Sequence, residues 1–237
     1  MARKEDDRRH FEKARFRPSE LISTSLRGHF RLNAVKSKPW LPYIAPFAIY
    51  ALFLMVQSRQ NLVWIYPLKT IAVAAALLFF WKYYEELRPG FSVLAVVVGL
   101  IAIVIWIGID PYYPQASGAE IFDPSGKPVF IAFRIVGAVL VVPVMEELFW
   151  RAFLIRWLVN PDFKRVPVGT FTWASFAITV ALFGLEHNQW LAGMICGALY
   201  NWLYYKRKSV FACVVAHAVS NAALATWVMA RGDWKFW

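Results

Sequence analysis

The side chains that could do chemistry are ionisable groups set in otherwise apolar stretches of the second half of the chain. The segment "PVMEELFWRAFL" at 143–154 carries two adjacent glutamates and an arginine. Charges in such a setting are costly, by about 2.5–3.5 kcal/mol each on membrane-insertion scales, and usually have a function. The candidate residues are Glu146, Glu147, Arg151, Glu186, His187 and His217, with Asn221 as an uncharged polar partner.

The spacing of these residues places them on shared helix faces. Glu147 and Arg151 are four residues apart, as are His217 and Asn221, and side chains at this spacing lie next to each other on a helix. A structural alternative is that these groups only join helices by hydrogen bonds of about 0.6 kcal/mol each. Asn221 alone fits that alternative well, but two carboxylates and two imidazoles are a costly way to join helices.

The two glutamates are expected to have different roles. Glu147 can pair with Arg151 and stay ionised, whereas Glu146 points about 100° away around the helix and has no partner nearby in the sequence. Glu146 is therefore free to act as a general base. Imidazoles from other helices could position a water, and an imidazole and an amide could donate to an oxyanion. Together these groups suit attack of water on an amide carbonyl.

Three motifs carry a family resemblance. "EELFWR" at 146–151 matches EExxxR, "FGLEH" at 183–187 matches FxxxH, and "HAVSN" at 217–221 matches HxxxN. Over about 129–225 the chain resembles the CPBP family of CAAX-type prenyl-protein endopeptidases and bacteriocin-processing or self-immunity proteins. It is also similar to the CAAX protease-related proteins associated with exosortase systems. The resemblance does not extend to the CAAX-type substrate specificity, because none of the motif residues indicates recognition of a prenyl group.

The resemblance implies an intramembrane endopeptidase of the glutamic type that needs no cofactor. Glu146 would activate water, with His187 as its partner. His217 and Asn221 would stabilise the oxyanion. The remaining motif residues, which would support the site, are Glu147 and Arg151.

The rest of the chain predicts an all-α, multi-pass transmembrane bundle of about seven spans. Of its 237 residues 59% are hydrophobic and only 17% are charged, which is unusual for a soluble domain. Residues 1–38 hold 11 of the basic residues and are predicted to form a basic cytoplasmic tail, not a cleavable signal peptide, with the bundle at 39–237. The predicted spans are roughly 40–56, 62–81, 91–109, 129–158, 170–187, 190–205 and 209–230.

Basic residues orient this bundle. With the N-terminus in the cytoplasm, 19 Lys and Arg fall in inside segments and 4 in outside segments. The net charge of +11 then indicates contact with membrane lipids, not nucleic acid. We expect an integral membrane protein, in the cell membrane if bacterial. Lys69 and Arg134 lie within the spans, close to their outer ends, where extension to the lipid headgroups would explain them.

The predicted site imposes one geometric condition. Glu146 is about 16 Å from the inner end of its helix, whereas His187 is about 25 Å from the inner side. His217 is about 13 Å from the inner end of its helix, and the three residues meet only if the fifth and sixth helices form a short hairpin that stops partway through the bilayer. Gly193 and Gly197, a GxxxG pair, permit the close approach that such a hairpin needs.

Other functions remain open. Glu146, His187 and His217 could hold a catalytic zinc, although HExxH is absent. The same groups could relay protons in a transporter, or the fold could serve a non-catalytic binding or immunity role. A reactive Cys213–His217 pair is less favoured than a buried packing cysteine. The expected partners are a protein or peptide substrate, with or without a lipid group, and membrane lipids.

Overall fold

In the computed structural model, residues 37–90, 92–116 and 121–237 are described, so nearly all of the predicted tail at 1–38 lies outside them. The all-α class is confirmed, because this part of the chain contains helices and turns but no strand. All seven predicted segments are helical. Six form α2 (Leu41–Val56), α3 (Leu62–Phe80), α4 (Val93–Ile109), α8 (Trp173–Leu185), α9 (Trp190–Arg207) and α10 (Val210–Arg231). Single 3₁₀ turns follow as η1 (Trp81–Tyr83), η2 (Asp110–Tyr112), η5 (Phe163–Arg165) and η6 (Trp234–Phe236).

The seventh segment is one long helix that changes its winding twice. It runs through α5 (Pro128–Val136), η3 (Gly137–Val141), α6 (Val142–Glu147), η4 (Leu148–Leu154) and α7 (Ile155–Trp157). Both η3 and η4 are π-helical, and they flank the predicted base. Such π segments are rare and often occur at functional sites.

Pro143 explains why a carbonyl in the first π segment, that of Ala138, receives a hydrogen bond from a side chain. Val142 donates its N–H to the carbonyl of Gly137, and Pro143 has no N–H to offer to Ala138. The Ala138 carbonyl is therefore free, and Asn221 Nδ2 donates to it at 2.8 Å. The asparagine thus joins α10 to the long helix.

In the part of the chain that the structure describes, four helical segments are long and apolar enough to cross a membrane. They are Leu62–Tyr83, Val93–Tyr112, Pro128–Trp157 and Val210–Arg231, and α2 and α8 are shorter apolar helices. Large apolar side chains such as Trp64 and Val104 are about three-quarters exposed on these helices. Hydrocarbon is the solvent that suits such a surface.

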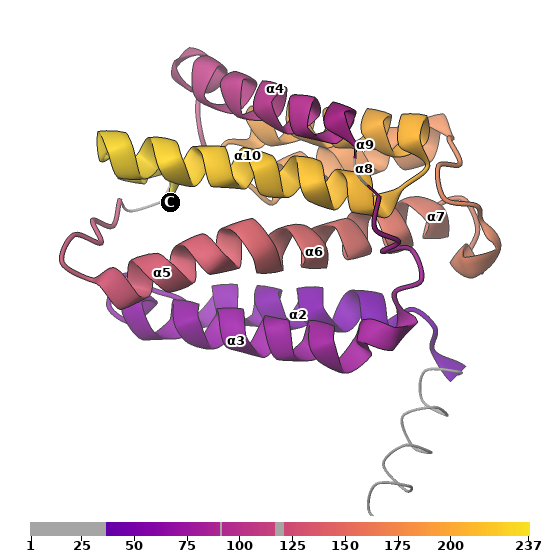
Figure 1. Ribbon diagram of the computed structural model, residues 1–237, viewed down its shortest axis with the longest axis horizontal. Coiled ribbons are helices and arrows are strands. Elements are labelled where there is room, and N and C mark those ends of the chain that lie inside the picture. The colour runs from indigo at the N-terminus through magenta and orange to yellow at the C-terminus, as the bar shows by residue number, and fades with distance from the viewer. Residues whose placement is uncertain (1–36, 91, 117–120) are drawn as a thin grey trace, which may run out of the picture. The chain divides into compact units, whose positions relative to one another are not determined.

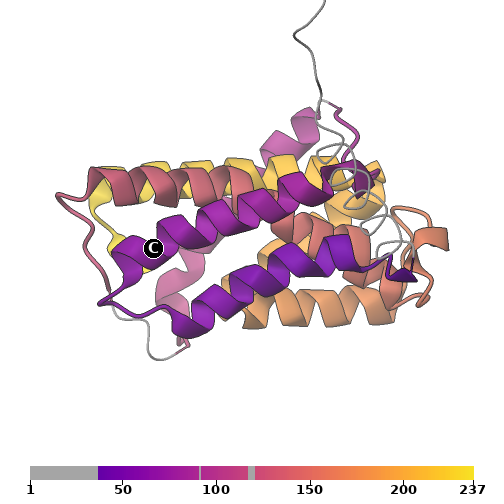
Figure 2. The same ribbon diagram turned by 90° about the horizontal axis from the view of Figure 1, so that it is seen from below.

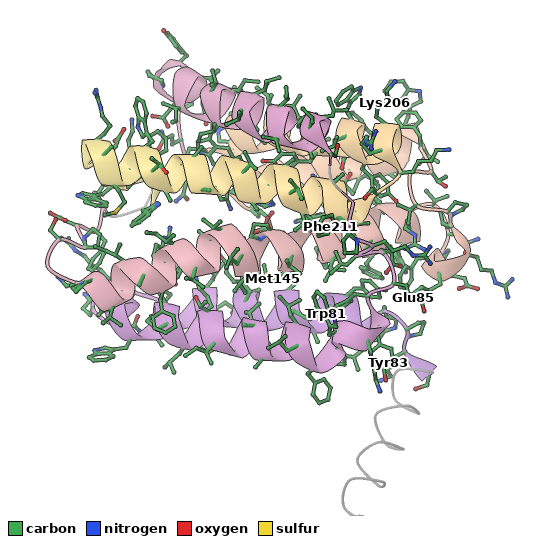
Figure 3. The ribbon with its side chains drawn as sticks, in the orientation of Figure 1. Trp81, Tyr83, Glu85, Met145, Lys206 and Phe211 are labelled. Carbon is green, nitrogen blue, oxygen red and sulfur yellow. The ribbon has the colours of Figure 1, made fainter. Side chains whose placement is uncertain are left out.

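The helices of the Pro42–Trp237 unit lie on both sides of the long helix. Figures 1 and 2 show α2 and α3 side by side along one of its faces. On the other face α10 packs against α6, and α4 packs against α10 and α9. The residue preceding Glu146 in the long helix, Met145, lies in this interior and is 1% exposed (Figure 3). The middle of the long helix is therefore covered from both sides.

Helices α8 and α9 form the close-packed hairpin predicted from the glycine pair. A Cβ on Gly193 would lie 3.0 Å from Gly184 Cα, and one on Gly197 would lie 3.1 Å from the Phe183 ring. The α8 helix has 13 residues, or about 20 Å of length, too short to span a bilayer alone. The expectation that this hairpin is short is confirmed for α8.

One end of the unit is fastened by a buried ionic network. Glu86, in the α3–α4 connection, accepts from Arg156 Nη1 at 2.7 Å and from Tyr43 Oη at 2.7 Å, and it pairs with Lys164 at 3.2 Å. Figure 3 labels the neighbouring Glu85 at this end, where Lys206 of α9 also lies. The network ties the α3–α4 connection to α2 and to the end of the long helix.

Candidate functional site

The predicted site residues come together around Glu146. Its carboxylate, that of Glu186 and the His187 imidazole each offer an atom within 4.8 Å of the others. His217 Nε2 lies 4.0 Å from Glu146 Oε2. These four residues and Asn221 line one cavity of about 690 Å³. The other four residues lie 40 to 75 positions after Glu146 in the sequence and share a single pocket with it.

His187 can reach Glu146 because α8 ends before it. The helix ends at Leu185, so His187 lies in the connection to α9, within reach of Glu146. Its Nδ1 lies 2.7 Å from the Phe183 carbonyl. A carbonyl oxygen only accepts, so Nδ1 carries the hydrogen and the neutral ring leaves Nε2 as an acceptor.

Glu147 and Arg151 form a buried pair beneath the cavity. Their side chains are 0% and 1% exposed, and Arg151 Nη1 lies 3.0 Å from Glu147 Oε1. Arg151 also donates to Asn201 Oδ1 at 3.2 Å and to the Gly197 carbonyl at 3.3 Å. The guanidinium therefore ties the long helix to α9.

His217 is held by Glu147. Its Nδ1 donates to Glu147 Oε1 at 3.0 Å, and its ring stacks on Tyr200 at 5.4 Å between centroids. Because Nδ1–H is used in this way, any further proton that His217 takes up goes to Nε2, the nitrogen that faces Glu146.

Two polar groups at the site received no role from the sequence. Glu186 is one of the ionisable candidates and lies within the FxxxH motif, but nothing in the sequence gives it a role; in the structure it accepts from Trp150 Nε1 at 3.1 Å beside Glu146. Trp106 of α4 lines the cavity, and its buried Nε1 has no hydrogen-bond acceptor among the described residues. Its ring lies 5.3 Å from that of His187. A tryptophan in an apolar helix carries no sequence signal of such a position.

The residues best placed to hold a metal differ from the predicted set. Among the described residues, the group with mutually close ligand atoms is Glu146, Glu186 and His187, so Glu186 takes the place expected for His217. His217 is instead bound to Glu147 through Nδ1. Two carboxylates and one imidazole are a ligand set that zinc accepts.

Comparison with known proteins gives a match to the part of the chain that contains Glu146, Glu186, His187, His217 and Asn221. Residues 128–223 match the family model described as type II CAAX prenyl endopeptidase Rce1-like. The predicted resemblance to the CPBP family is confirmed over these residues. Neither a curated protein nor a solved structure matches the chain. The family supports, in general terms, an intramembrane peptidase acting on a protein or peptide.

Proposed function

Since residues 128–223 match the Rce1-like endopeptidases, we propose that this protein hydrolyses a peptide bond within the membrane, using water activated by Glu146. One observation carries the proposal. Glu146 is 5% exposed at a cavity wall, and its Oε2 has no hydrogen-bond partner among the residues described. A buried carboxylate oxygen without a donor is costly unless a water or substrate group binds it.

In the proposed reaction Glu146 makes both proton transfers that hydrolysis of the peptide bond needs. Glu146 takes one proton from water as the water oxygen attacks the carbonyl carbon of the substrate. The tetrahedral oxyanion then collapses, Glu146 gives the proton to the leaving nitrogen, and the C–N bond breaks. The products are a new carboxyl terminus and a new amino terminus.

The imidazoles flank the proposed water site. The 4.0 Å between His217 Nε2 and Glu146 Oε2 exceeds a direct hydrogen bond and suits a bridging water. His187 offers its Nε2 lone pair to the same water, while Glu147 orients His217. These roles follow the sequence prediction, except that His217 donates to an oxyanion only when Nε2 is protonated.

Two further donors support the oxyanion in this proposal. Asn221 Nδ2 uses one hydrogen on the Ala138 carbonyl and retains a second. Trp106 Nε1 is a donor without an acceptor in the same cavity. A donor fixed in a site of low polarity stabilises developing negative charge without reorganising.

Comparing cells that contain wild-type protein with cells that contain Glu146→Gln tests the proposal. Gln keeps the shape and removes the base, so an uncut membrane-protein precursor is expected to accumulate and can be identified by mass spectrometry. That precursor, reconstituted in liposomes, should be cleaved by wild type and by the control variant Glu85→Gln. Glu85 is exposed and lies next to Glu86, away from the cavity. Equal cleavage by Glu146→Gln would show that Glu146 is not the base.

A zinc peptidase is the second candidate, favoured by the proximity of Glu146, Glu186 and His187. In that mechanism the metal would lower the pKa of its bound water, and Glu146 would be a ligand instead of a base. Chelation followed by zinc addition separates the two mechanisms.

A further inference from the structure

The segment that follows α10, residues 232–237, forms part of the wall of the cavity that contains Glu146. Gly232 has a φ of +66°, which glycine adopts without strain, and it turns the chain back from the end of α10. The rings of Trp234 and Trp237 contact each other, with 5.7 Å between their centroids, so the segment forms a compact unit. The side chains of this segment that line the cavity are Trp234, Lys235, Phe236 and Trp237.

This segment covers the end of the cavity where Lys69 of α3 and Arg134 of α5 lie. Arg134 Cζ lies 4.7 Å from the Tyr66 ring centroid and 5.8 Å from that of Trp237, and Figure 1 marks the C-terminus beside α5. Lys69 is 1% exposed, so the expectation that it extends to the lipid headgroups is wrong. Its ammonium lies inside the protein because the face of α3 that carries it packs against the long helix.

One ion pair fastens the segment to the end of α4. Lys235 Nζ donates to Asp110 Oδ2 at 2.7 Å, and Gln115 Nε2 donates to Asp110 Oδ1. The Asp110 side chain is 3% exposed, whereas that of Lys235 is 39% exposed. Among the described residues, the backbone hydrogen bonds of residues 233–237 stay within the segment. A partly exposed ion pair contributes little to stability and is screened by salt, so the segment can separate from α4 without disrupting the bundle.

We propose that residues 232–237 form a lid, which closes the cavity when Lys235 pairs with Asp110 and opens when this pair breaks. Gly232 is the hinge, and the Gln115 amide remains as a donor to Asp110 in the open state. Substrate enters in the open state, whereas the closed lid separates the cavity from the solvent outside it. The effect on cleavage rests on the proposed function, but the opening itself does not.

Cys196 can report the opening, because it lines the cavity, whereas Cys213, the other cysteine of the chain, is not among the lining residues. In a Cys213→Ser background, the rate at which sulfonatoethyl methanethiosulfonate modifies Cys196 is followed by mass spectrometry of the intact protein in detergent. Lys235→Met and Asp110→Asn should each raise this rate about three- to tenfold, as expected for loss of a partly exposed charged hydrogen bond. The reagent is an anion, so loss of the lysine charge by itself would slow the labelling, and acceleration by Lys235→Met reports opening.

Further variants test whether both residues act through one contact. The double variant, Lys235→Met with Asp110→Asn, should be labelled no faster than either single variant. High salt should accelerate labelling of the wild-type lid but not of the double variant, and Lys235→Arg should keep labelling slow. Lys206→Met, which removes an exposed lysine that does not line the cavity, is the matched control and should be labelled at the wild-type rate.

Two results would overturn the lid. One is an unchanged labelling rate in folded Lys235→Met protein whose melting temperature equals that of wild type. The other is a double variant whose acceleration equals the product of the two single effects, because the two residues would then act independently. Cleavage is scored separately: the open variants should lower KM by the factor seen in labelling and leave kcat unchanged, since a closed lid only reduces the fraction of protein that can bind. Faster labelling in a protein that cleaves nothing refutes only the endopeptidase, and cleavage with unchanged labelling refutes only the lid.

Discussion

Glu147 Oε1 accepts hydrogen bonds from both His217 Nδ1 and Arg151 Nη1, each at 3.0 Å. One carboxylate oxygen therefore fixes the imidazole that faces Glu146 and neutralises a buried guanidinium. The adjacent glutamates of the motif divide their work: Glu146 lines the cavity, and Glu147 holds the groups around it.

We predict that Glu147→Gln destabilises the fold as well as the site. Arg151 would remain buried with no counter-charge, a change that typically costs about 3–5 kcal/mol. The melting temperature in detergent should fall clearly, and His217 should lose its fixed orientation. Asp162→Asn breaks the exposed pair with Arg165 and should leave the melting temperature unchanged. Equal melting temperatures for Glu147→Gln and wild type would show that the ion pair does not stabilise the fold.

The helices and the meeting of the motifs could be predicted from the sequence because both depend on local patterns. Apolar runs bounded by Pro, Gly and charged residues predicted where the seven helical segments lie. The short hairpin that contains α8 was inferred separately, from the need to bring His187 to Glu146. Neither π segment was predicted, and in the first one the Ala138 carbonyl receives its hydrogen bond from Asn221 on a distant helix in place of the donor that Pro143 lacks.

The burial of Lys69 was not predictable for a different reason. Helix α3 is apolar on all sides, so its sequence does not show which face packs against the long helix. The position of Trp106 in the cavity wall was also not predictable, because it depends on the packing of α4 against α9 and α10.

Trp106→Phe is expected to slow the reaction without changing the fold. The substitution keeps a ring beside His187 and removes the Nε1 donor. Loss of one oxyanion donor typically lowers kcat by about 10²-fold or more, with little change in KM. Trp64→Phe, at a side chain that is 75% exposed, is the control for loss of an indole. An unchanged kcat would remove Trp106 from the mechanism.

Gly184→Ala should disturb the α8–α9 hairpin that positions His187. The added Cβ would overlap Met194 Cγ and would lie 2.7 Å from the Trp190 carbonyl oxygen. Overpacking of this kind costs about 1–3 kcal/mol, and we expect both the melting temperature and the cleavage rate to fall. Gly108→Ala meets no atom within 4 Å and should be neutral or slightly stabilising. Similar behaviour of the two variants would contradict the close contact.

The network at Glu86 predicts a loss of stability in acid. Burial alone would raise the pKa of Glu86, but Lys164, Arg156 and Tyr43 together hold that pKa below its ordinary value. Stabilisation by this carboxylate is therefore complete above the unfolded-state pKa of about 4.3 and is lost as pH falls through the lower folded-state pKa. Glu86→Gln should lower the melting temperature at pH 7, and its difference from wild type should shrink below pH 4. Glu85→Gln, at an exposed neighbour, should follow wild type at each pH.

Metal ions should inhibit the enzyme if Glu146 is a base. Chelators such as EDTA are expected to leave cleavage unchanged, because the proposed water is activated by a carboxylate. Added zinc should inhibit, since the mutually close Glu146, Glu186 and His187 would bind it and occupy the base. Glu186→Gln removes one ligand and should raise the zinc concentration for half-inhibition at least about tenfold, because loss of even an outer-shell partner of a metal ligand typically costs 10- to 100-fold in affinity. Loss of cleavage on chelation with recovery on zinc addition would instead make Glu146 a ligand, and the same three residues would then define a zinc peptidase.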